Sequence, residues 1–329
     1  MGWCFWWREW VGSMGTLSEL GKSYVTGDRL SLLEGRLLVD PPPGAVLAPI
    51  PPSLMGAPAA PELETRIQLD RPPERFVMMV SQLHQFIADD FRQAVERIVA
   101  GWDLPAGTTT KVLPVPLTDG GGLEVMAVAR MPLDTTRQAV PVMNAFARHP
   151  DSTLARVDCY VSPNGADDPA GCGMLAFGIL GTLRVGPRRL DWSARTVSLV
   201  GPDGQVALTA TVPAGWLATT QHGVSFVVHR IERLMPFGNS FASITVYVGG
   251  HPSPAHRGQP EGAVSVANGR LLGQDTPWHT IHVGPDTPVQ CEAMVPFDGA
   301  DLLHVVTASN DAAVSTELAA IAGSLAKSG

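Results

Sequence analysis

The chain has 329 residues, which favours two domains over one, and its 45% hydrophobic residues supply enough material for real cores. A formal net charge of −8 without a dense Lys/Arg cluster argues against a nucleic-acid surface, because such a surface needs a basic stripe. No apolar run reaches the roughly 18 residues of a membrane-spanning helix. No signal peptide is recognised, so we expect a soluble protein and favour the cytoplasm.

Residues 1–29 are predicted to form a tail outside the folded domains. Four tryptophans between residues 3 and 10 recur at helical spacing, and such a face suits a peripheral contact with a membrane interface. The alternative is a disordered tail, with Met14 as the true start of the protein.

A first domain is predicted over 30–186. It begins with a strand that enters the turn Pro42-Pro43-Gly44 and continues with strands at 62–70 and 74–83. The segment 88–102 has Asp89 or Asp90 as N-cap and repeats apolar residues at helical spacing. We expect this helix to bury one face, formed by Phe91, Val95, Ile98 and Trp102.

Antiparallel strands then follow, and 173–186 is predicted to close the first domain as a helix. A polar joint at 187–196 leads to a second domain over 197–329. The turn Pro213-Ala214-Gly215 repeats the entry of the first domain.

The second domain also repeats the later elements of the first. Residues 289–309 parallel 142–162, and 315–325 parallel the closing helix, with Ile321 matching Ile179 and Leu325 matching Leu183. The pattern therefore predicts an α+β protein made of two tandem copies of one domain.

The second copy departs from the first in one segment. "HPSPAHRGQPEG" (251–262) stands where the first copy has its long helix, so one face of the second sheet is expected to lose its cover. Alternation along 243–250 puts Ile244, Val246 and Val248 on one face and leaves Thr245 and Tyr247 on the other. We take Thr245 and Tyr247 as candidate partner-binding residues. The rival outcome is that the loop itself, or the first domain, covers that face.

The entry segments "VDPPPGAV" and "TVPAGWL", with the exits "GILGTL" and "AIAGSL", resemble the PsbP-like α/β/α sandwich. That fold is shared by the photosystem protein PsbP, bacterial DcrB-type proteins and small chaperones of secreted type VI effectors. The resemblance covers about 30–326 and implies two tandem PsbP-like domains. It implies a binding module and transfers no active site.

The usual catalytic constellations are weak or missing. Neither a GxxxxGK[ST] loop nor a GxGxxG motif is present, and Ser240 in "GNSFA" lacks the context of a nucleophile elbow. His279 and His282 would point to opposite faces of a strand. We interpret His251, His256 and Glu261 as solvated loop residues, the alternative being a metal or proton site. We interpret Asp167 and Asp168 as turn residues, the alternative being a calcium loop.

Cys159 and Cys172 flank one loop and are interpreted as two buried thiols, the alternative being a disulfide. No cofactor or catalytic residue is predicted.

Two functions follow as hypotheses. The first is a non-catalytic protein-binding module, a chaperone or adaptor associated with secretion, whose partner is another protein, a hydrophobic helix or a second copy of the chain. The alternative is a hydrolase or metal-dependent enzyme with a site between the domains. Convergence of the histidines and acids on one point would favour the enzyme.

Overall fold

The computed structural model describes residues 26–50, 63–71, 74–131, 140–161, 169–238, 240–281 and 289–328. It is an α+β protein of mostly antiparallel sheets. The chain divides into two compact units, with the change at Arg189/Leu190 and with His84–Phe86 counted in the second unit. Within the described residues, no helix is long and apolar enough to cross a membrane.

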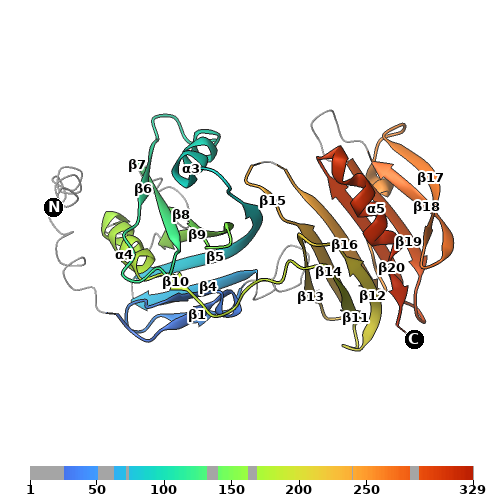
Figure 1. The fold of residues 1–329 in the computed structure, drawn as a ribbon, viewed down its shortest axis with the longest axis horizontal. Coiled ribbons are helices and arrows are strands. Elements are labelled where there is room, and N and C mark those ends of the chain that lie inside the picture. The colour runs from blue at the N-terminus through green and yellow to red at the C-terminus, as the bar shows by residue number, and fades with distance from the viewer. Residues whose placement is uncertain are drawn as a thin grey trace. The chain divides into compact units, whose positions relative to one another are not determined.

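The first unit combines a small sheet of three strands, a large sheet with seven strands in sequence and two helices (Figure 1). The small sheet has the order β1 (Leu30–Leu32), β2 (Leu37–Val39), β10 (Arg184–Val185), with the short 3-10 turn η1 (Leu33–Gly35) between β1 and β2. The large sheet has the order β3 (Val46–Ala48), β4 (Glu64–Arg71), β5 (Glu74–Phe86), β9 (Thr153–Val161), β8 (Val140–Arg148), β7 (Glu124–Met131), β6 (Thr109–Pro114).

The two sheets of the second unit have the same strand order as those of the first. Its small sheet is β11 (Arg195–Val200), β12 (Val206–Val212), β21 (Ala326–Lys327). Its large sheet has the order β13 (Trp216–His222), β14 (Phe226–Arg233), β16 (Ala242–Gly249), β20 (Leu302–Ser309), β19 (Val289–Pro296), β18 (Gln274–Ile281), β17 (Val264–Leu271). The two-residue strand β15 (Met235–Pro236) is not part of this sheet. Strand for strand, β4 and β5 correspond to β14 and β16, and the hairpin β8–β9 corresponds to β19–β20.

Both entry turns place a glycine at positive φ. Gly44 and Gly215 adopt φ values of 88° and 85°, a left-handed conformation that glycine reaches without steric cost. In the second unit the next residue, Trp216, is fully buried and its Nε1 donates to Glu317 Oε2 at 2.9 Å, which ties the turn to the closing helix.

The exit motifs also make the same hydrogen bonds. Thr182 donates to the carbonyl of Ile179 at 2.8 Å and accepts from the Asp40 amide at 3.1 Å. Ser324 donates to the carbonyl of Ile321 at 2.7 Å and accepts from the Thr211 amide at 2.9 Å. Each hydroxyl thus ends a helix and attaches it to the small sheet.

The closing helices are shorter at their carboxyl ends than predicted. Helix α4 spans Pro169–Gly181 and α5 spans Ser315–Gly323, the latter after the 3-10 turn η4 (Ala312–Val314). Residues 184–185 leave the helix because they pair with β2. Ile179, Leu183, Ile321 and Leu325 are all buried in the cores of their units.

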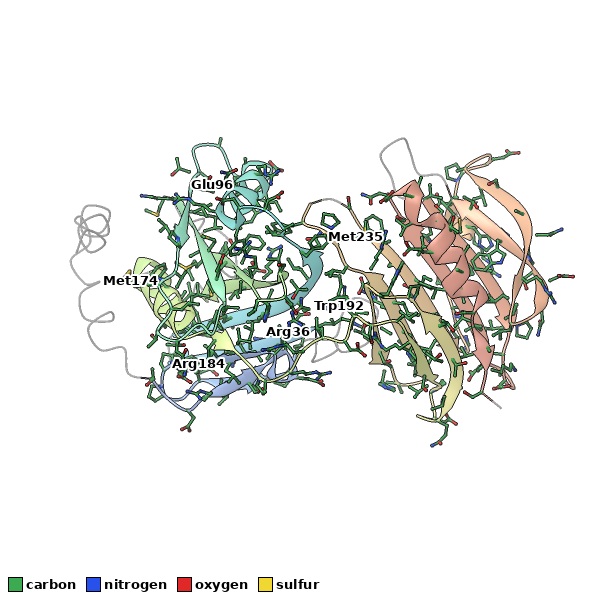
Figure 2. All side chains as sticks on the ribbon, in the orientation of Figure 1. Arg36, Glu96, Met174, Arg184, Trp192 and Met235 are labelled. Carbon is green, nitrogen blue, oxygen red and sulfur yellow. The ribbon has the colours of Figure 1, made fainter. Side chains whose placement is uncertain are left out.

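Helix α3 (Phe91–Ala100) begins after Asp90, whose side chain accepts from the Gln93 amide at 2.9 Å. Its buried residues are Phe91, Ala94, Val95 and Val99. The prediction for Ile98 was therefore wrong in part, because Ile98 is only half-buried and the neighbouring Val99 faces the sheet. Glu96 lies on the outward side, where it pairs with Arg92 (Figure 2).

One predicted match between the copies is displaced by one residue. The hairpin turns close with His149 N–H to Thr153 C=O and with Phe297 N–H to Asp301 C=O, so 148 positions separate corresponding residues of β8–β9 and β19–β20. The sequence comparison had aligned residue 142 with residue 289, which is a shift of 147. In a strand, one residue of displacement exchanges the two faces.

Candidate functional site

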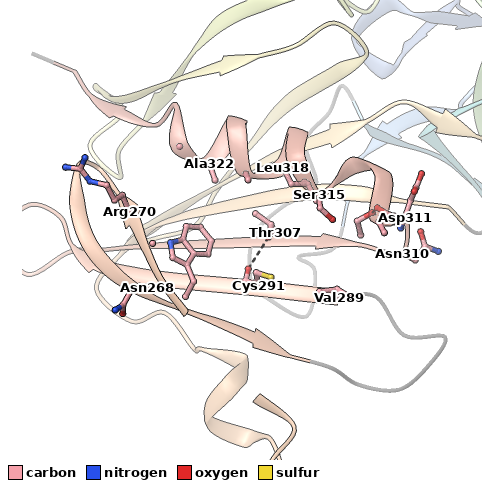
Figure 3. Close-up of a pocket in the computed structure, with 16 residues that line it drawn as sticks. Asn268, Arg270, Val289, Cys291, Thr307, Asn310, Asp311, Ser315, Leu318 and Ala322 are labelled. Carbon is pink, nitrogen blue, oxygen red and sulfur yellow. Dashed lines mark hydrogen bonds between the residues drawn. The ribbon is translucent and has the colours of Figure 1, made fainter. Parts of the chain in front are cut away.

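A groove lies in the second unit between helix α5 and the strands β17 to β20 (Figure 3). Its volume is about 790 Å³, within the range of ligand pockets. We call it the α5 groove. Its lining comprises Asn268, Gly269, Arg270, Trp278, Val289, Cys291, Thr307, Ser309, Asn310, Asp311, Ala312, Ser315, Leu318, Ala319, Ala322 and Gly323.

The floor of the groove has smaller or more polar side chains than the same place in the first unit. With the displacement of 148, Cys291, Thr307 and Ser309 occupy the positions of Met143, Cys159 and Val161. The first-unit residues are all buried in its core cluster. In the second unit Thr307 and Ser309 are buried but polar, and Cys291 is half-buried and outside the core cluster.

The helix wall differs in the same way. The matching hydroxyl bonds of Thr182 and Ser324 place Ala319 where α4 has Phe177, and Ala322 where it has Leu180. Leu180 is fully buried and Phe177 packs against the core of the first unit. Smaller residues on both walls leave space in the second unit that the first unit fills with its own side chains.

The floor is further shaped by Gly269 on β17. A Cβ atom at Gly269 would lie 2.5 Å from Cδ1 of Trp278, so only glycine lets the indole lie in this position. Trp278 packs against the core cluster of the unit. It thereby supplies a flat apolar surface to the groove.

Polar groups of the lining are held by bonds within the unit. Ser309 Oγ donates to the carbonyl of Phe241 at 3.0 Å, and Asn310 Oδ1 accepts from the Phe241 amide at 2.9 Å. Asp311 accepts from the Ala313 amide at 2.9 Å in front of α5. Among the described residues that line the groove there is no histidine.

A second cluster lies on the opposite face of the same sheet, around Glu292. This carboxylate is 1% exposed and accepts four hydrogen bonds. Oε1 accepts from the backbone amide and Nδ1 of His256, both at 2.7 Å; Oε2 accepts from the Ala255 amide at 3.2 Å and from His304 Nε2 at 2.9 Å. We call this set the Glu292 clamp.

The clamp fastens the loop 251–262 to the sheet. Burial alone would raise the pKa of the Glu292 carboxyl, but the hydrogen bonds from His256, Ala255 and His304 outweigh it and hold the pKa below its ordinary value. The loop contains the short 3-10 turn η3 (Ala255–Gly258), which stands where the first unit has α3. The face opposite α5 is therefore covered in part by the loop, as in the rival outcome.

Some of the predicted histidines do converge. The rings of His256 and His279 stack at 3.8 Å beside Glu292, whereas His251 and Glu261 are exposed. Both Glu292 oxygens are already occupied by donors, so the cluster has the features of a structural fastening. Among the described residues, no group of three or more His, Cys, Asp or Glu could hold a metal.

The remaining candidates are placed as follows. Ser240 is half-buried just before β16 with no helix behind it. Cys159 and Cys172 are buried and are not joined in a disulfide, and burial raises the pKa of the Cys159 thiol. His282, Asp167, Asp168 and residues 1–25 lie outside the described residues.

Thr245 and Tyr247 lie on the face away from α5, as the alternation predicts, while Ile244, Val246 and Val248 are buried. Both candidate residues are half-buried, and the Tyr247 ring stacks on Phe226 at 5.4 Å. Their role in binding stays a prediction.

Comparisons with known proteins add little. No family model matches the chain. No curated protein matches it either. A solved structure, the apo form of the immunity protein TplEi of the type VI secretion system from Pseudomonas aeruginosa, is 10% identical over 91% of this chain and 96% of that chain. Its TM-score is 0.23, which is too low to bear on fold or function.

Proposed function

We propose that this chain is a non-catalytic protein-binding module, a chaperone or adaptor made of two tandem domains of the PsbP/DcrB type. The observation that supports it most directly is the α5 groove, an open space beside a helix that contains the flat apolar surface of Trp278 and no catalytic pair among its described lining residues. Val289 stands at this groove with 47% of its surface exposed and gives a partner an apolar contact.

The alternative of a hydrolase or metal-dependent enzyme has less support. Its best evidence is the convergence of His256, His279 and His304 on Glu292. A general base needs a free lone pair within reach of its substrate, and a carboxylate that is 1% exposed with four donors offers none.

The proposal is tested by site-specific photo-crosslinking in the host cell. A benzoyl-phenylalanine at Val289 samples the groove, one at Tyr247 samples the opposite face, and one at Val224, a fully exposed loop residue, is the matched control. We expect a crosslinked polypeptide from Val289 and none from Val224.

The Tyr247 probe tests the sequence-based site separately. Crosslinks from Tyr247 alone would move the binding surface to the face predicted from the sequence. Absence of a crosslink at Val289 and Tyr247, or equal crosslinking at all three positions, would contradict the proposed function.

A further inference from the structure

The α5 groove corresponds to a filled region of the first unit, so the first unit indicates the chemistry that fits there. The side chains that occupy its space are Phe177 and Leu180 on the helix and Met143 on the floor. All three are large and apolar. The second unit has Ala319, Ala322 and Cys291 at these positions and keeps the surrounding strand order.

The charged groups of the lining lie away from the middle of the groove. Arg270 and Asp311 are the charged members of the lining, and they lie at opposite ends of it (Figure 3). Arg270 donates to the carbonyl of Gly273 at 2.8 Å, and Asp311 caps the turn before α5. The middle of the groove, with Trp278 and Leu318, therefore suits a neutral apolar group.

One end of the groove distinguishes a polypeptide from an acyl chain. Asn310 lies at the end marked by Asp311, with Ser315 nearby on the helix (Figure 3), whereas Asn268 pairs with Pro277 and so projects to the face of the sheet opposite Trp278. An amide and a hydroxyl at that end match the N–H and C=O groups of a peptide backbone beside a buried side chain. An acyl chain would gain nothing from them.

We propose that the α5 groove takes a neutral segment of a partner polypeptide and buries large apolar side chains, Phe, Leu or Met, in the space that the first unit fills with Phe177 and Leu180. This proposal rests on the proposed function, since it names the chemistry of the segment that the module binds. The partner completes in the second unit the packing that the first unit completes by itself.

The test uses the full chain and defined probes. One probe is a labelled twelve-residue peptide of Ser, Gly and Ala with a Phe and a Leu three residues apart. The second replaces both with Ala, and palmitate is the third. By fluorescence anisotropy we expect saturable binding of the Phe/Leu peptide, at least ten-fold tighter than the Ala peptide, and no competition by palmitate.

Two variants place the binding in the groove. Ala319→Phe restores the ring that Phe177 supplies in the first unit and should weaken peptide binding at least ten-fold. Ala320→Phe adds the same ring to the next residue of α5, which is exposed and does not line the groove, and should leave binding unchanged. Ala319→Leu provides the same test if the phenylalanine variant does not fold by circular dichroism.

Equal affinity for the two peptides, or binding that survives the filling of the groove, would overturn the proposal. Displacement by palmitate would assign the groove to acyl chains instead. A crosslink at Val289 without preference for the Phe/Leu peptide would reject this inference and keep the protein-binding function. Preference for the Phe/Leu peptide without any crosslinked partner would keep this inference and reject the protein-binding function.

Discussion

Replacing Glu292 should release the loop 251–262 from the second sheet. In Glu292→Gln one carboxylate oxygen becomes an NH2 group that faces one backbone amide and one imidazole. The imidazole can accept from it after a change of tautomer, but the backbone amide cannot. One buried donor left without an acceptor costs about 1–3 kcal/mol, and Glu292→Ala, which removes all four bonds, about 3–5 kcal/mol.

The loss of stability caused by Glu292→Gln should be present at neutral pH and disappear in acid. The folded-state pKa of Glu292 is lowered, so its stabilisation is complete above the ordinary value of 4.5 and is lost as pH falls through the folded pKa. The stability gap between the parent and Glu292→Gln should therefore persist from pH 8 to 5 and close below about 4.5.

Urea unfolding measures the gap, and hydrogen exchange of the peptide that spans 251–262 localises it. The amides of Ala255 and His256 should lose protection in the variant, because both donate to Glu292. Glu261→Gln is the matched control, since it makes the same change at an exposed carboxylate of the same loop. Equal stabilities of the two variants, or unchanged protection at 255–256, would refute the clamp.

Two further predictions test the fold. Val99→Asp should destabilise the first unit by several kcal/mol in thermal melts, because Val99 is 4% exposed and an unpaired carboxylate would be buried, whereas Ile98→Asp should cost less; equal losses would mean that the helix is rotated. Thr182→Ala and Ser324→Ala should each lower the free energy of unfolding by about 1 kcal/mol, because each removes the hydroxyl that joins a closing helix to its small sheet. Denaturant unfolding measures this loss, and no loss in either variant would show that the exit motifs have another role.

The repeat was accessible from the sequence because its signals are local. The entry turns need glycine at positive φ, at Gly44 and Gly215, and the exits need a hydroxyl directly after the helix, at Thr182 and Ser324. Such requirements mark the same residue type at the same place in each copy.

The α5 groove and the Glu292 clamp could not be predicted from the sequence, because both depend on the exact alignment of the strands of the two copies. An alignment of the two copies with an offset of 147 residues instead of 148 matches Glu292 with Ala145, a core residue. It therefore does not predict that Cys291 faces α5. The partners of Glu292 lie 36 and 12 residues away, at His256 and His304, so no short motif announces them. The small residues Ala319 and Ala322 indicate an open space only when they are compared with Phe177 and Leu180 at the matching positions of the first unit.

The register also explains how the second unit manages without a full second helix. Glu292 corresponds to Asn144, which is buried on the same face of the first sheet and donates to Asp158 across the strands. In the first unit, α3 covers this face, and Trp102 near its end lies against Phe146. In the second unit Val306 replaces Asp158, so Glu292 has no polar residue directly opposite on β20 and is bonded by the loop and by His304, two residues away on that strand. A short loop with a buried charge thus covers part of one face, and α5 with its small side chains leaves the groove on the other. The differences between the units lie on both faces of one hairpin, which is why the second unit, and not the first, is the place to look for a partner.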